Sequence, residues 1–183
     1  RIDVLINCAG VMYFTLMKNL HLDEWERTVD INCKGTMNGC GAVLPLFLEQ
    51  KSGHIVNISS VAAHEAYIGG SVYCATKHAV NAFTIATRHD LAGTPIRVTA
   101  ISPGMVETEF SVVRMGDEEK AKKVYENIVP MVAEDVADQI IYATTRPRHV
   151  QIADIISYAT NQGHAKYVVE RKGPDMGASP PSS

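Results

Sequence analysis

Short apolar and β-branched runs alternate along the chain with longer stretches that begin and end at helix-capping signals. The apolar runs predict β-strands at residues 4–7, 55–59, 96–101 and 151–157. The capped stretches predict helices at residues 23–47, 73–91 and 134–144, with a short, highly charged helix within 117–127. Because strands and helices alternate, the pattern predicts an α/β fold with a parallel sheet covered on its faces.

Several signals locate the boundaries and irregularities of the predicted helices. Asp23 is expected to cap the first long helix, which we expect to be interrupted near residues 32–35 and kinked at Pro45. Gly93 is expected to end the second long helix, and the Arg146-Pro147 pair stops the last one.

Composition narrows the class of protein. The 183 residues are 46% hydrophobic, which is ordinary for one globular domain, here expected at residues 1–172. Residues 173–183, rich in Gly, Pro and Ser, predict a disordered tail. A net charge of -3 argues against nucleic-acid or anionic-membrane binding. No apolar run approaches the ~18 residues of a membrane span, and the four cysteines lack metal-binding or disulfide spacing, so we expect a cytoplasmic protein.

Ser60, Tyr73 and Lys77 form the most informative set of polar residues. Tyr73 and Lys77 are four residues apart on a predicted helix, so their side chains leave the same face. Ser60 ends a predicted strand at the sheet edge where open α/β folds bind ligands. At about 4 Å and an effective dielectric constant of about 20, the ammonium would stabilise a phenolate by roughly 4 kcal/mol. That attraction would bring the pKa of Tyr73 to about 7, which suits general acid–base catalysis.

With these residues in view, the chain resembles the short-chain dehydrogenase/reductase family over nearly its whole length. The family's motifs occur in the family's order: Asn7-Cys8-Ala9-Gly10, with Cys8 in place of the usual second Asn; Asn32 within residues 29–35; then Ser60, Tyr73 and Lys77; and finally residues 102–108, which match the family's Pro-Gly loop. The resemblance implies a Rossmann-type, doubly wound parallel sheet and an NAD(P)-dependent oxidoreductase.

The resemblance also implies roles for individual residues. Tyr73 would exchange a proton with the alcohol or carbonyl oxygen, Ser60 would hydrogen-bond that oxygen, and Lys77 would bind the nicotinamide ribose. Asn32 would complete the catalytic set by holding a water molecule. The expected cofactor-binding residues are Asn7, Ala9, Gly10, Tyr73, Lys77, Pro103, Gly104, Val106 and Thr108.

The family's first strand and Gly-rich phosphate-binding turn are not found in this sequence. Residues 1–6 resemble the fourth strand of the family fold, so we expect an N-terminally incomplete domain that lacks about 80 to 90 residues. The residue that selects NAD or NADP belongs to that part. NADP is therefore expected from the resemblance alone, and NAD is not excluded.

The segment after the Pro-Gly loop resembles the NADP-dependent 3-hydroxy acid dehydrogenase branch, which oxidises serine and allo-threonine. Arg114 is a candidate for binding the substrate carboxylate. The alternative, which the sequence favours equally, is that Arg114 is a solvent-exposed loop residue without a binding role. Other readings remain: a carbonyl or steroid reductase of the same family, or a non-catalytic fragment that acts as an interaction module. A homodimer or homotetramer is expected.

One further motif is weak. His64-Glu65 has the first two residues of a zinc-binding helix, but Ile68 stands where the second histidine is required, so no metal site is expected.

Overall fold

The computed structural model describes residues 1–165 and 167–168, and its centre is a four-stranded parallel sheet. The strand order is β1 (Val4–Asn7), β2 (Gly53–Ile58), β3 (Ile96–Pro103) and β4 (Asp154–Ser157). Neighbouring strands pair in parallel, with Leu5 opposite Ile55 and Ile55 opposite Val98. The α/β fold and the parallel sheet predicted from the sequence are confirmed.

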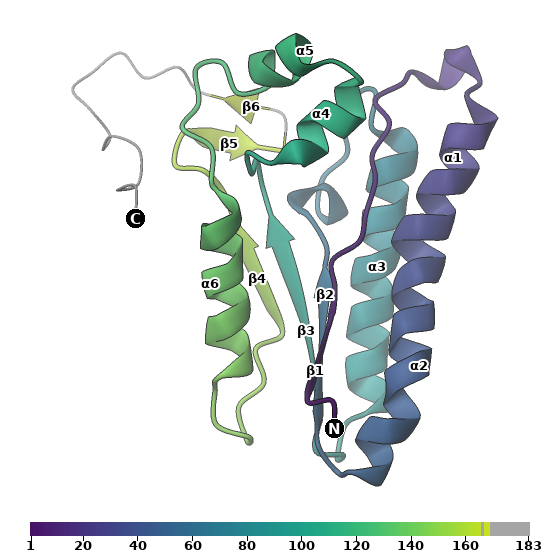
Figure 1. The fold of residues 1–183 in the computed structure, drawn as a ribbon, viewed down its shortest axis with the longest axis vertical. Helices are drawn as coiled ribbons and strands as arrows, with labels where there is room; N and C mark the ends of the chain where they lie inside the picture. The colour runs from purple at the N-terminus through teal and green to yellow at the C-terminus, as the bar shows by residue number, and fades with distance from the viewer. Residues whose placement is uncertain (166, 169–183) are drawn as a thin grey trace.

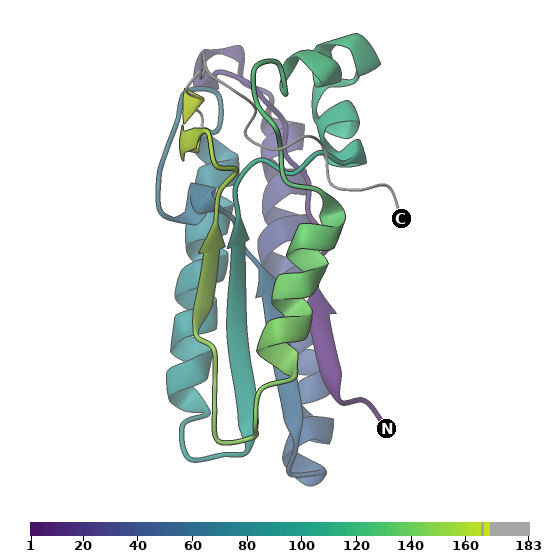
Figure 2. The ribbon, with the colours of Figure 1, turned by 90° about the vertical axis from the view of Figure 1, so that its left-hand side faces the viewer.

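Helices cover both faces of the sheet. Figures 1 and 2 show α2 (Gly35–Glu49) and α3 (Ser71–Asp90) on one face and α6 (Ala133–Thr144) on the other. The core between the sheet and α2 and α3 contains Phe47, Ile55 and Val98, each with no exposed surface. Gly53 is required there, because a Cβ at this position would lie 2.2 Å from the Phe47 ring.

The predicted interruption of the first long helix is confirmed. Helix α1 (Leu22–Val29) passes into a π-helical turn, η2 (Asp30–Lys34), which leads directly into α2. The π-turn buries Asn32, and π-turns in helices are frequent at functional sites. The prediction that Asp23 caps the helix is wrong: His21 is the N-cap, and Asp23 lies in the first turn, where its charge favours the positive end of the helix dipole.

Several element boundaries differ from those predicted: for example, β2 begins at Gly53 rather than at residue 55, and α3 begins at Ser71 rather than at residue 73. Two of the differences have a clear local cause. The last strand begins at Asp154 rather than at residue 151, because the Gln151 side chain takes the place of a backbone partner by accepting a hydrogen bond from Val98 N at 2.7 Å. The charged helix, α5, is shorter than predicted (Glu118–Lys123) and is capped by the Asp117 side chain.

The structure adds elements that the sequence analysis did not predict. Helix α4 (Glu109–Met115) begins at the Thr108 side chain and ends at Gly116, whose φ of 63° suits glycine. Strands β5 (Gln162–His164) and β6 (Tyr167–Val168) form an antiparallel pair, and η1 (Met17–Asn19) and η3 (Val61–Ala63) are short 3-10 turns. Figure 1 shows α4, α5, β5 and β6 gathered at the carboxyl ends of the strands.

Among the described residues, no helix combines the length and apolarity that crossing a membrane requires. The predicted tail at residues 173–183 lies outside the described residues.

Candidate active site

A cavity of about 620 Å³ opens at the carboxyl ends of β2 and β3. Its walls come from the loop after β1, from η3, from the start of α3, and from α4 and α6. Nine of the residues singled out in the sequence line this cavity: Gly10, Ser60, Tyr73, Lys77, Pro103, Gly104, Val106, Thr108 and Arg114. The fold therefore brings together motifs that are more than a hundred residues apart in the sequence.

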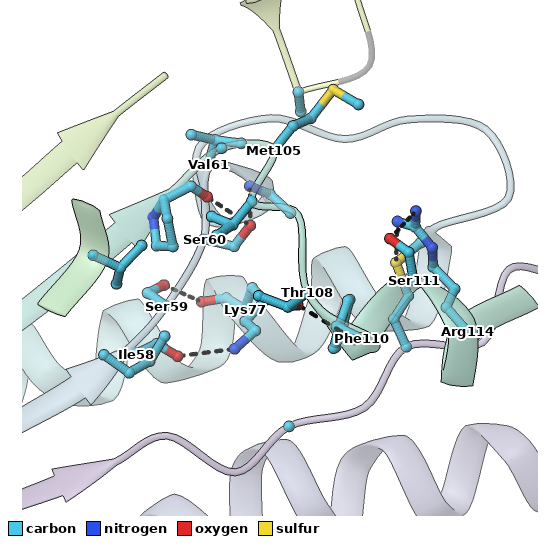
Figure 3. A pocket seen from close by; sticks show the side chains of 18 of the residues that line it. Ile58, Ser59, Ser60, Val61, Lys77, Met105, Thr108, Phe110, Ser111 and Arg114 are labelled. Atoms are coloured by element: carbon cyan, nitrogen blue, oxygen red, sulfur yellow. Dashed lines mark hydrogen bonds between the residues drawn. The ribbon is translucent and has the colours of Figure 1, made fainter. Parts of the chain in front are cut away.

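Ser60 stands at the N-cap of η3, directly after β2. Its hydroxyl accepts a hydrogen bond from Ala62 N at 3.1 Å and lies 3.5 Å from Pro103 O. The residue is only 9% exposed. The short helical turn and the neighbouring strand thus hold the Ser60 hydroxyl at the cavity wall (Figure 3).

Tyr73 and Lys77 share one face of α3, as predicted, but they do not pair directly. The Lys77 ammonium lies 5.7 Å from the centre of the Tyr73 ring and donates to Ile58 O at 2.8 Å (Figure 3). The Tyr73 ring packs at 6.2 Å from the ring of Phe110 on α4.

The sequence-based prediction for the pKa of Tyr73 is wrong in this structure. Burial raises the pKa of the phenol to about 12, although a hydrogen bond with Ser60 and the charge of Arg114 lower it. Burial lowers the pKa of the Lys77 ammonium to about 8. Desolvation disfavours the charged form of both groups, and this cost exceeds the attraction that helical spacing alone suggested.

Asn32 joins the loop after β1 to helix α3. Its side-chain oxygen accepts from Val11 N at 2.8 Å, and its amide donates to Val11 O at 2.9 Å and to Thr76 Oγ1 at 3.0 Å. A Cβ added at Gly10 would lie 3.4 Å from the Asn32 oxygen and 3.8 Å from the Lys77 ammonium. The Asn32 side chain makes these three hydrogen bonds with protein groups and does not line the cavity, so its predicted water-binding role stays a prediction.

Asn7 and Ala9 are likewise absent from the cavity wall. The Asn7 amide donates to Asn57 Oδ1 at 2.8 Å and lies 3.4 Å from both Thr36 O and Cys40 Sγ. It therefore supports the fold behind the site. The side chain at the substituted position, Cys8, lines the cavity itself.

Backbone hydrogen bonds hold the Pro-Gly loop on both sides. Gly104 N donates to Ser157 O at 2.7 Å, and Met105 O accepts from Met131 N at 3.0 Å. Met105 N donates to the Gln162 side chain at 2.8 Å. The loop is thus a fixed wall of the cavity.

Arg114 extends from α4 into the cavity. One guanidinium nitrogen donates to Ser111 Oγ at 3.1 Å, and another contacts Met12 Sδ at 3.8 Å (Figure 3). Its Nε is buried and has no hydrogen-bond partner among the described residues. Of the described residues that line the cavity, none is acidic, so the charges there are those of Lys77 and Arg114. The site therefore favours an anionic ligand.

The sequence analysis missed part of the cavity wall. Helix α6 contributes an apolar stripe at helical spacing, and Met12 and Tyr67 contribute from the loops. The stripe consists of Ala133, Val136, Ala137 and Ile140. Such a stripe indicates a face turned inward, but spacing alone does not distinguish a cavity wall from packed core.

Comparisons with known proteins identify the family of this chain. The family model described as short chain dehydrogenase matches residues 1–119. The chain is 44% identical to an NADP-dependent 3-hydroxy acid dehydrogenase of Schizosaccharomyces pombe, over 93% of this chain and 67% of that protein. It is 39% identical to a serine 3-dehydrogenase of Agrobacterium fabrum, over 93% of this chain and 69% of that protein.

A solved structure gives the same result in three dimensions. The closed form of a serine dehydrogenase complexed with NADP+ superposes with a TM-score of 0.87 at 41% identity, covering 93% of this chain and 70% of that chain. The family model and these relatives show that the chain belongs to the short-chain dehydrogenase/reductase family. This is the oxidoreductase family that its sequence motifs resemble.

Proposed function

We propose that the chain carries the catalytic part of an NADP(H)-dependent dehydrogenase that acts on the 3-hydroxyl group of a hydroxy acid such as serine. The observation that carries this proposal is the placement of Arg114 in the same cavity as Ser60, Tyr73 and Lys77. The names of the relatives support the same substrate class and the same cofactor.

Tyr73 is the proposed general acid and base. At pH 7 its phenol is protonated, because its pKa lies near 12. The protonated phenol is therefore suited to donate a proton to a carbonyl oxygen during reduction. Oxidation of an alcohol, in the reverse direction, requires the phenolate form of Tyr73. Ser60 hydrogen-bonds the Tyr73 phenol. It would also hydrogen-bond the reacting oxygen of the substrate, hold that oxygen in place and stabilise the charge that develops on it.

The residues around Lys77 fit a nicotinamide dinucleotide. Among the described residues the ammonium has one acceptor, Ile58 O, which leaves two of its three N–H groups for the hydroxyl groups of a ligand. Gly10 leaves the space in front of Lys77 open, because it carries no Cβ. Gly10, Pro103, Gly104, Val106 and Thr108 would hold the nicotinamide end of the cofactor. Bound NADP supplies the hydride-transfer chemistry.

Arg114 is the proposed clamp for the substrate carboxylate. Its guanidinium lies in a cavity without acidic side chains and has an unpaired Nε, so a carboxylate would supply the missing acceptor. Charge-assisted hydrogen bonds of this kind contribute roughly 1.5 to 3 kcal/mol, which corresponds to about 10- to 150-fold in binding.

A carbonyl reductase that takes an apolar substrate is the second candidate function. The apolar stripe on α6 favours it, because that wall offers a non-acidic substrate a hydrophobic surface. The two candidates differ in whether the substrate carries a carboxylate.

The test compares serine and 3-hydroxybutyrate with alcohols of similar size that lack the carboxylate, in NADP-linked assays of wild type and Arg114→Ala. We expect Arg114→Ala to raise KM for the hydroxy acids by about 10- to 150-fold and to leave KM for the neutral alcohols unchanged. Arg146→Ala is the matched control, because Arg146 stacks on Tyr142 at 4.3 Å and does not line the cavity. Preference of the wild type for neutral carbonyls would favour the second function.

A further inference from the structure

The segment of residues 157–165, here called the clasp, connects two walls of the cavity. On one side it holds the Pro-Gly loop, because Ser157 O accepts from Gly104 N at 2.7 Å and Gln162 Oε1 accepts from Met105 N at 2.8 Å. The fit is close, since a Cβ at Gly104 would lie 2.4 Å from Gln162 Oε1.

Gln162 uses both ends of its amide. While its oxygen accepts from the Pro-Gly loop, its nitrogen donates to His164 O at 3.2 Å and to Ala165 O at 3.5 Å. The side chain is 5% exposed, and a buried amide whose groups are all paired fixes the relative position of its partners. Ala165, one of those partners, lines the cavity.

Glu65 connects the clasp to the loop that follows Ser60. One carboxylate oxygen accepts from Tyr158 OH at 3.0 Å. The other accepts from Ala165 N at 2.6 Å and lies 3.0 Å from His164 Nε2. The adjacent His64 lies 3.5 Å from Asp154, so the His64-Glu65 pair contacts the C-terminal segment at two points.

We propose that Gln162 and Glu65 are positioning residues, which set the spacing between the Pro-Gly loop and the Ser60 loop through their shared partner, Ala165. Neither side chain lines the cavity. This inference rests on the proposed function, in which the Pro-Gly loop holds the nicotinamide end of NADP. Gln162 acts through the Met105 amide, and Glu65 acts by fixing Ala165 and the clasp.

The first test measures hydrogen–deuterium exchange in peptides spanning residues 104–108, in protein expressed from its full coding sequence. Gln162→Met keeps the length of the side chain and removes the acceptor, so the Met105 amide should exchange at least about tenfold faster. Gln162→Glu keeps an acceptor for Met105, so it should restore protection at residues 104–108. It should also accelerate exchange near residues 163–165, because a carboxylate repels the carbonyls of His164 and Ala165.

The second test measures the Kd for NADP+ by calorimetry in Gln162→Met, Glu65→Ala and the double variant. Each single variant should weaken binding by about tenfold. The double variant should weaken it by far less than the product of the two effects, because residues that act through one element are not additive. Gln50→Met, at the far end of α2, is the control and should leave the Kd unchanged.

Three outcomes overturn the proposal. They are an unchanged exchange rate at residues 104–108 in Gln162→Met, failure of Gln162→Glu to restore protection at these residues, and fully multiplicative losses of NADP+ affinity in the double variant. Failure of the wild type to bind NADP+ would instead contradict the proposed function. The exchange measurements would still decide whether the clasp positions the loop.

Discussion

Two groups of buried or partly buried polar side chains lie close together in this molecule, and they differ in how far they pair with one another. The first, here called the interior cluster, lies between the sheet and helices α2 and α3. It consists of Asn7, Cys40, Asn57 and Thr84. The second, the cavity group, lies at the carboxyl ends of the strands and consists of Ser60, Tyr73, Lys77 and Arg114.

In the interior cluster each side chain hydrogen-bonds with another. Asn57, with no exposed surface, accepts from Asn7 at 2.8 Å and donates to Thr84 at 2.9 Å. In the cavity group, and within the part of the chain that the structure describes, Arg114 Nε has no hydrogen-bond partner and the Lys77 ammonium has one acceptor. The difference indicates that mutual pairing of side chains serves the fold, while donors that face a cavity without a protein partner are available to a ligand.

The largest expected effect concerns the cavity group. Tyr73→Phe removes the proton that the mechanism exchanges, so kcat/KM for hydroxy acid oxidation should fall by about 10³-fold. The free energy of unfolding should change little, because the Phe ring still packs against Phe110. Tyr142→Phe, on the exposed surface of α6, should retain wild-type activity. A Tyr73→Phe enzyme that kept a tenth of the wild-type rate would exclude Tyr73 as the general base.

The interior cluster should give the opposite result. Asn57→Leu preserves the approximate size of the side chain but removes the acceptor of the 2.8 Å hydrogen bond from the Asn7 amide and the acceptor of the Cys40 thiol. We expect the free energy of unfolding to fall by about 2 kcal/mol, measured by urea denaturation. Asn38→Leu, on the exposed side of α2, should stay within about 0.5 kcal/mol of the wild type. Equal stability of the two variants would mean that the cluster does not support the fold.

The smallest expected effect is a change in pH dependence. Hydroxy acid oxidation needs the Tyr73 phenolate, and the raised pKa of Tyr73 means that kcat/KM should increase with pH above 8. Because the Ser60 hydrogen bond lowers that pKa, Ser60→Ala should move the rising limb to higher pH. Because pH 7 and pH 10 both lie below a pKa of about 12, the loss of kcat/KM should be the same factor at these two pH values, and the rising limb should level off at a higher pH than in the wild type. A rising limb that levels off at the same pH as in the wild type would assign Ser60 a role in binding alone.

Much of this molecule follows from local patterns in the sequence. The alternation of strands and helices predicted the parallel sheet, and the polar residues at 32–35 predicted the interruption that the structure places at Asp30–Lys34. Ser60, Tyr73 and Lys77 were expected together, and they line one cavity. Helix α4 was not predicted, although Thr108 and Gly116 mark its two ends. A seven-residue helix is too short for its periodicity to be recognised in the sequence.

The sequence by itself determined the order of the elements, the family resemblance and the residues that gather at the carboxyl edge of the sheet. Only the tertiary structure decided the direction of the Tyr73 pKa shift, the interior position of Asn7 and the link from Glu65 and Gln162 to the cavity walls. The physical reason is that periodicity and motifs report the backbone within a few turns. Desolvation and hydrogen-bond pairing depend on groups up to a hundred residues apart in the chain.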